Sequence, residues 1–92
     1  MSSGTRWASL EVQWAPGAVR EAGRLDPPVR FSIVKDLEDY AATGRGDVVR
    51  LTNYNPPQYR LRVGGWRVRF TIDWEVRVLY VLSVQPRGRA YR

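Results

Sequence analysis

The segment from Tyr59 to Phe70 alternates apolar and basic side chains on both sides of a Gly64-Gly65 pair. Such alternation predicts two antiparallel strands joined by a two-residue turn. In this register one face carries the apolar pairs Val63–Trp66, Leu61–Val68 and Tyr59–Phe70, and the other carries the arginine pairs Arg62–Arg67 and Arg60–Arg69. The fold must therefore bury one face of a β-hairpin and leave four guanidinium groups on the other.

The two arginine pairs of this hairpin lower the stability of the folded chain. Like charges directly opposite on antiparallel strands repel, because their side-chain roots lie only about 5 Å apart. The Coulomb cost is about 1 kcal/mol per pair in water and rises several-fold at a partly desolvated surface. The arginines either splay into water on an ordinary solvated face or bind a polyanion, and the repulsion favours the polyanion.

The distribution of charge supports the same interpretation. Residues 46–92 hold nine basic and three acidic side chains, which accounts for the whole formal net charge of +6. Fourteen of the fifteen basic residues are arginines. A one-sided basic excess is typical of nucleic-acid binders, and arginine favours ligands with bidentate acceptors such as phosphates.

Several functional classes are excluded or disfavoured by composition. The chain contains no cysteine and no histidine, which excludes disulfides, Cys/His zinc sites and histidine acid–base chemistry. The helical carboxylates Asp36, Glu38 and Asp39 are expected to face solvent, so no metal and no cofactor are expected. No apolar run reaches membrane length and no signal peptide is evident, so we expect a cytoplasmic protein without a membrane partner.

The order of patterns predicts an α+β fold for residues 1–92 as a single domain. The expected elements are a strand at Ser9–Trp14, a helical hairpin over Pro16–Thr43 ending at Gly44, a loop over Arg45–Pro57, the arginine hairpin, and a last strand at Val76–Val84. The N-terminal strand and the helical hairpin should pack on a small, mostly antiparallel four-stranded sheet. The expected core comprises Trp14, Ile33, Leu37, Leu61, Val68, Phe70 and Tyr80.

The basic C-terminal tail adds a tyrosine to the arginine surface. Arginine can hold a phosphate and stabilise charge in a phosphoryl transition state, but it cannot act as a base. Nearby positive charge favours the phenolate form of a tyrosine. Tyr91, between Arg89 and Arg92 and near Arg87, is the best candidate for such a tyrosine. The alternative is a frayed terminal aromatic with no function.

Five segments of the chain resemble toxins of the RelE/ParE superfamily of bacterial type II toxin–antitoxin modules. They are Val12–Ala18, Arg24–Arg30, Gly46–Leu51, Tyr59–Val68 and Arg87–Arg92. The resemblance extends from Leu10 to the end of the chain, and the segment Tyr59–Val68 with the basic tail ending in tyrosine is its most specific part. It implies the toxin fold of that superfamily and an acidic protein antitoxin as partner.

In the RelE branch, the resemblance implies an endoribonuclease that cuts mRNA in the ribosomal A site without a metal. The ribose 2′-OH attacks its own 3′ phosphate and leaves a cyclic phosphate and a free 5′-OH. By the resemblance, Arg67, Arg87 and Tyr91 would be catalytic and Arg60 and Arg62 would bind the RNA. The remaining basic residues predicted to contact RNA phosphates are Arg69 and Arg89.

The sequence departs from the family's pattern at two places, and two other functions remain as alternatives. Arg60 and Arg62 stand where the family often has lysines, so they can bind and stabilise but not transfer a proton. Gln85-Pro86 replaces the small-residue-plus-basic turn common before the tail arginine. The ParE branch shares the fold but poisons DNA gyrase, and an inactive nucleic-acid or antitoxin-binding module is a third possibility. Retention of the arginines and the tyrosine favours RelE-like chemistry.

Overall fold

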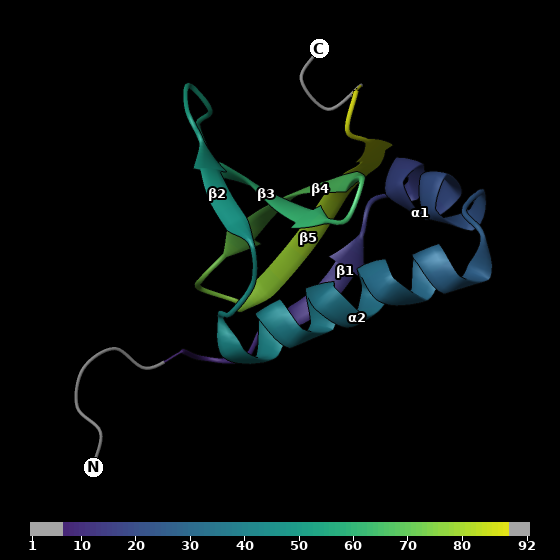
Figure 1. The fold of residues 1–92 in the computed structure, drawn as a ribbon. Coiled ribbons are helices and arrows are strands. Elements are labelled where there is room, and N and C mark those ends of the chain that lie inside the picture. The colour runs from purple at the N-terminus through teal and green to yellow at the C-terminus, as the bar shows by residue number, and fades with distance from the viewer. Residues whose placement is uncertain (1–6, 89–92) are drawn as a thin grey trace.

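In the part of the chain that the computed structural model describes, residues 7–88, five strands form one sheet and two helices cover one of its faces (Figure 1). The elements are β1 (Glu11–Trp14), α1 (Pro16–Gly23), α2 (Pro27–Thr43), β2 (Val48–Leu51), β3 (Gln58–Val63), β4 (Trp66–Asp73) and β5 (Val78–Pro86). The strand order is β1-β5-β4-β3-β2, with β1 parallel to β5 and the other pairs antiparallel. The predicted fold class, α+β with a helical hairpin on a mostly antiparallel sheet, is confirmed.

The β3–β4 hairpin has the register that the alternation predicted. Leu61 pairs with Val68 and Tyr59 with Phe70, whereas Arg62 pairs with Arg67. Gly64 in the turn has φ +57°, a backbone conformation that glycine adopts without a steric penalty. The hairpin therefore separates an apolar face from an arginine face.

The helical hairpin also begins and ends where local chemistry predicted. Each helix begins with a proline in its first turn, where the missing N–H breaks no intrahelical hydrogen bond. Helix α2 ends at Gly44, whose left-handed φ of +78° lets its N–H donate to the Tyr40 carbonyl at 2.7 Å. The buried residues of the two helices follow helical spacing and are Ala18, Ala22, Ile33, Leu37, Tyr40 and Ala41.

The core lies between α2 and the helix-facing side of the sheet, and one residue predicted to lie there does not. Leu79 and Val81 of β5 are fully buried, so Tyr80 between them points to the opposite face and is 36% exposed. The prediction that Tyr80 is a core residue is therefore wrong. Trp14 packs against the edge of the core and remains partly exposed.

The sheet has one strand more than the sequence predicted. Val48–Leu51 was expected to be loop, but it forms β2 and pairs with β3 along the sheet edge. Four residues with mixed exposure give too short an alternation to indicate a strand, and only the partner strand fixes them. This addition places Asp47, the residue before β2, beside the end of β3, where its carbonyl accepts the N–H of Arg62 at 2.9 Å.

A cluster of aromatic side chains packs the segment before β1 against the end of α2. The indole N–H of Trp7 donates to the Ala41 carbonyl at 2.8 Å. The Trp7 ring lies edge-on to Tyr40 and Trp74, with centroids 5.2 and 5.1 Å away. Tyr40 in turn contacts Phe70, so the cluster connects the surface to the core.

Candidate nucleic-acid interface

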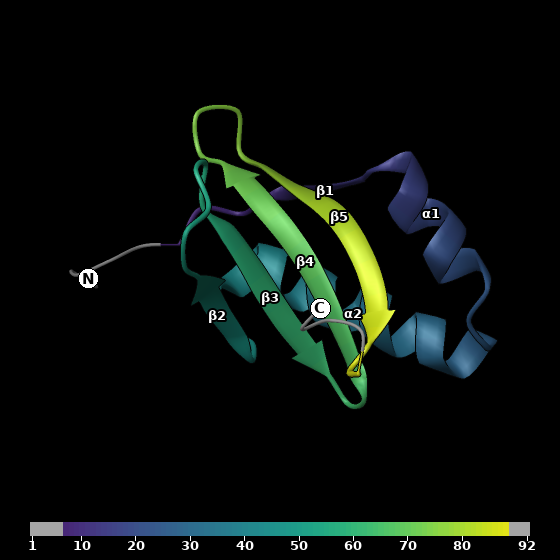
Figure 2. The same cartoon turned by 90° about the horizontal axis from the view of Figure 1, so that it is seen from above.

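The sheet face opposite α2 carries the predicted arginines. Seen from this side, β3, β4 and β5 lie in front of α2 (Figure 2). Leu61, Val68 and Phe70 are buried on the helix side of the sheet, so their neighbours in sequence point away from the helices. These neighbours are Arg60 and Arg62 on β3 and Arg67 and Arg69 on β4. We call this surface the arginine face.

An open depression of about 810 Å³ lies at the turn end of the arginine face. Its lining comes from the residue before β2, from β3, the hairpin turn and β4, and from the residue after β5. The lining residues are Asp47, Arg62, Gly64, Arg67 and Arg87. The backbone N–H of Arg87 donates to the Gly65 carbonyl at 2.9 Å, which ties the end of β5 to the hairpin turn. Tertiary structure therefore brings Arg87 to the two hairpin arginines, Arg62 and Arg67, in one concavity, which we call the arginine depression.

Arg67 is the most rigidly held side chain of the arginine depression. It is only 5% exposed, and its Nη1 donates to the carbonyls of Gly64 and Trp66, each at 2.9 Å. Its buried Nε has no hydrogen-bond partner. Arg67 thus braces the turn and holds a positive charge at a fixed place in the depression.

The other two arginines of the depression differ in their partners. The Nε of Arg62 donates to Oδ2 of Asp47 at 2.6 Å, and both side chains are about half exposed. Between residues 7 and 88 the ion pairs are this one and Lys35–Asp39. The described carboxylates therefore leave the charges of Arg67 and Arg87 without an ion-pair partner, which suits the binding of an anion.

Two further predicted arginines lie on the same face outside the depression. Arg60 and Arg69 are opposite each other on β3 and β4. The guanidinium of Arg69 lies 5.0 Å from the ring centroid of Tyr54 and donates through Nη2 to Oε1 of Gln58. Tyr54, Gln58 and Asp47 were missed as site residues, because the contacts that bring them to the arginine face depend on tertiary structure. The predicted site residues Arg89 and Tyr91 lie outside the described residues.

Two kinds of feature are absent from the described residues. No group of three histidine, cysteine, aspartate or glutamate side chains within residues 7–88 could hold a metal ion. Neither helix is long and apolar enough to cross a membrane. What the arginine face can do is bind an extended anion and stabilise negative charge that develops on it.

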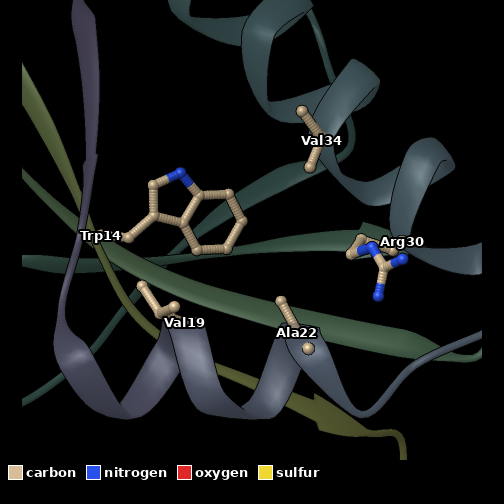
Figure 3. Close-up of a pocket in the computed structure, with 6 residues that line it drawn as sticks. Trp14, Val19, Ala22, Arg30 and Val34 are labelled. Atoms are coloured by element: carbon tan, nitrogen blue, oxygen red, sulfur yellow. The ribbon is translucent and has the colours of Figure 1, made fainter. Parts of the chain in front are cut away.

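A second concavity, of about 420 Å³, lies between the two helices and β1. Figure 3 shows Trp14 of β1 facing Val34 of α2, with Val19 and Ala22 of α1 below and Arg30 at one end. The Nη1 of Arg30 donates to the Leu25 carbonyl at 3.2 Å. This interhelical groove is apolar along most of its lining and has a basic end.

The fold is shared with solved toxin structures. The archaeal RelE–RelB complex from Pyrococcus horikoshii matches with a TM-score of 0.75 and 22% identity, over 89% of this chain and 99% of that one. The RelBE2 toxin–antitoxin complex from Mycobacterium tuberculosis matches with a TM-score of 0.77 and 20% identity, over 90% and 97%. The isolated E. coli RelE toxin matches with a TM-score of 0.68 and 21% identity, over 90% and 92%.

Sequence comparison gives the family. Among curated proteins, none matches this sequence. A family model described as the ParE toxin of type II toxin–antitoxin systems, parDE, matches residues 12–91. That match spans both helices, β2 to β5, all but the first residue of β1, and the basic tail as far as Tyr91. The chain therefore belongs to the ParE toxin family of type II toxin–antitoxin systems, within the RelE/ParE superfamily.

Proposed function

We propose that this toxin is a metal-independent, ribosome-dependent endoribonuclease that cuts mRNA and thereby inhibits translation. The observation that carries the proposal is the convergence of Arg62, Arg67 and Arg87 in one depression. Three guanidinium groups around one concavity suit a phosphodiester, whose oxygens are bidentate acceptors. A pentavalent phosphorane carries more negative charge than the ground state, so fixed arginines stabilise it preferentially.

The proposed reaction needs proton transfers that arginine cannot supply. The 2′-oxygen bonds to the adjacent phosphorus, the bond to the 5′-oxygen breaks, and a 2′,3′-cyclic phosphate and a 5′-OH result. The 2′-OH loses its proton to a base, and the leaving 5′-oxygen gains one. Arginine stays protonated in proteins, so the proposal assigns proton transfer to Tyr91, whose phenolate takes the 2′-OH proton and passes it to the leaving 5′-oxygen, while Arg67 and Arg87 stabilise the charged phosphorane.

A second candidate function is the poisoning of DNA gyrase. The matched family is described as the ParE toxin of parDE modules, and the ParE branch acts on gyrase. This alternative needs a protein-binding surface rather than a phosphoryl-transfer site. The charges of the arginine depression, which suit a scissile phosphate, favour the ribonuclease.

The decisive experiment is induced expression without antitoxin, with global mapping of mRNA cleavage beside a gyrase supercoiling assay. Arg87→Ala should abolish cleavage and restore growth, because it removes one of the positive charges of the arginine depression. The fold should be retained, because the Arg87 side chain is exposed. Arg50→Ala is the matched control, since Arg50 pairs with Tyr59 and so belongs to the helix side of the sheet. Growth arrest with intact mRNA and inhibited supercoiling would establish the gyrase poison instead.

We further propose that an acidic antitoxin covers this toxin in the cell. Several of the structures with this fold are toxin–antitoxin complexes. Acidic side chains suit the arginine face, and an apolar helix face suits the interhelical groove. Co-expression with the neighbouring open reading frame should give a complex that co-purifies and melts at a higher temperature than the free toxin.

The groove can be tested separately from the arginine face. Val19 lines the groove and is 55% exposed. Val19→Asp should weaken the complex, because it adds a charge to an apolar contact that an acidic partner would have to bury. Phe31→Asp is the control, since Phe31 is an exposed apolar residue of α2 that does not line the groove. An unweakened complex in Val19→Asp would place the antitoxin elsewhere.

A further inference from the structure

Beside the arginine depression, a loop residue and two strand residues bring three planar side-chain groups into contact, and we call this cluster the Tyr54 platform. It consists of Tyr54 in the β2–β3 loop, Gln58 at the start of β3 and Arg69 in the middle of β4. We propose that the Tyr54 platform binds a nucleobase of single-stranded RNA whose phosphates occupy the arginine depression. This inference rests on the proposed ribonuclease function and names a second subsite of it.

The geometry of the platform suits stacking. The Arg69 guanidinium carbon lies 5.0 Å from the centroid of the Tyr54 ring, and Nη2 of Arg69 donates to Oε1 of Gln58. These contacts hold the guanidinium in place while Tyr54 remains 42% exposed. Nucleobases stack on tyrosine rings and on guanidinium planes, with little dependence on which base is bound.

The platform is close enough to the arginine depression for one RNA strand to occupy both. Arg67 in the depression and Arg69 in the platform are two residues apart on β4 and lie on one face. A strand rises about 3.3 Å per residue, so their backbones are about 6.6 Å apart, close to two stacked nucleotide rises of about 3.4 Å each. The β2–β3 loop projects on the side of the sheet opposite α2, beyond the arginine face (Figure 1).

The charge at the platform also points to a nucleic acid. Arg60 lies directly opposite Arg69 across the two strands, so a second positive charge flanks the stacking site. A nucleotide provides a base for the planar groups and a phosphate that suits the positive charge on this part of the arginine face.

The test measures the affinity of short single-stranded RNA oligomers, each intact or with one abasic position moved along its length. The wild-type toxin should lose about tenfold in affinity when one particular base is absent. Tyr54→Ala should bind the intact oligomer about tenfold more weakly, and its affinity should not fall further when that base is absent. Tyr54→Phe should behave as the wild type, because the ring is retained.

Two controls separate stacking from charge and from folding. Tyr80→Ala removes an exposed tyrosine from β5 on the same face and should leave the affinity unchanged. The slope of log affinity against log salt should be unaltered in Tyr54→Ala, since no phosphate contact is lost, whereas Arg87→Ala should lower it by about 0.7. Thermal melting of each variant shows whether the fold is retained.

The outcomes distinguish the platform from the function on which it rests. If folded Tyr54→Ala binds as tightly as the wild type, the three residues only brace the loop and the platform is overturned, while the ribonuclease stands. Failure of the wild-type toxin to bind the oligomers even at low salt also overturns the platform. The ribonuclease is judged independently by mRNA cleavage in cells, where Tyr54→Ala should slow cutting without abolishing it.

Discussion

Oδ2 of Asp47 lies 2.6 Å from Nε of Arg62, so the chain places one of its own carboxylates in the arginine depression. The backbone reinforces the contact, because the Arg62 N–H donates to the Asp47 carbonyl at 2.9 Å. Both side chains are about half exposed, and a pair of this kind contributes only about 0.2–1 kcal/mol to stability. We therefore expect Asp47 to affect the binding of anions more than the stability of the fold.

Asp47→Asn should raise the affinity of the toxin for single-stranded RNA several-fold at low salt. The substitution removes the negative charge that competes with phosphate for Arg62 and that repels the incoming strand. The measurement is RNA affinity across a range of salt concentrations, and the gain should shrink at high salt. Asp39→Asn is the control, because it removes the same charge from an ion pair on α2. Equal affinities for wild type and Asp47→Asn would mean that Arg62 does not contact the RNA.

Gly44→Ala should lower the free energy of unfolding by at least about 1–2 kcal/mol. Gly44 has a left-handed φ of +78°, which costs other residues about 1–2 kcal/mol. A Cβ there would also lie 2.5 Å from the Trp7 ring. Gly23→Ala is the control, since a Cβ there meets nothing within 4 Å and alanine is the better helix former. Urea denaturation should show loss of stability in Gly44→Ala alone.

Tyr40→Phe should make the toxin less sensitive to alkaline unfolding. Burial raises the pKa of Tyr40 above its ordinary value, and the neighbouring Tyr59 raises it further. The folded state then holds the phenolic proton more tightly than the unfolded state, so this stabilisation is complete below about pH 10 and is lost as pH rises through the folded pKa. Unfolding free energies measured from pH 8 to 11 should fall less steeply in the variant, and identical slopes would contradict the assignment.

Glu21→Ala should destabilise the fold by about 1–3 kcal/mol, since it leaves a buried backbone donor unsatisfied. Oε1 of Glu21 accepts the N–H of Val84 at 2.7 Å, and Oε2 accepts the side-chain amide of Gln85 at 3.1 Å. Glu21→Gln should cost less, because an amide oxygen can still accept one of these hydrogen bonds. Chemical denaturation of both variants checks the ranking, and equal losses would exclude the hydrogen bond as the cause.

The hydrogen bond between Glu21 and Gln85 also affects the arginine depression. Gln85 is the β5 partner of Arg67 on β4, so Glu21 connects α1 to the strand beside the arginine depression. In the sequence, Gln85 stood out only as a departure from the family's usual turn. In the fold it is part of β5 and is held by α1.

The sequence by itself determined those elements whose structure depends only on neighbouring residues in the chain. The register of the β3–β4 hairpin follows from alternation around Gly64-Gly65, because side chains on a strand alternate between faces. The ends of α2 follow from Pro27 and Gly44, whose backbone preferences act without tertiary contacts. These local rules also placed four arginines on one face of the sheet.

Only the tertiary structure decided what depends on distant partners. Strand β2 exists because β3 offers it an edge, and that pairing delivers Asp47 to Arg62. The continuous apolar run of β5 could not indicate which face Tyr80 would occupy. Arg87 reaches the arginine depression because β5 pairs with β4 along its length. Such contacts join residues far apart in the chain, and no spacing within either segment encodes them.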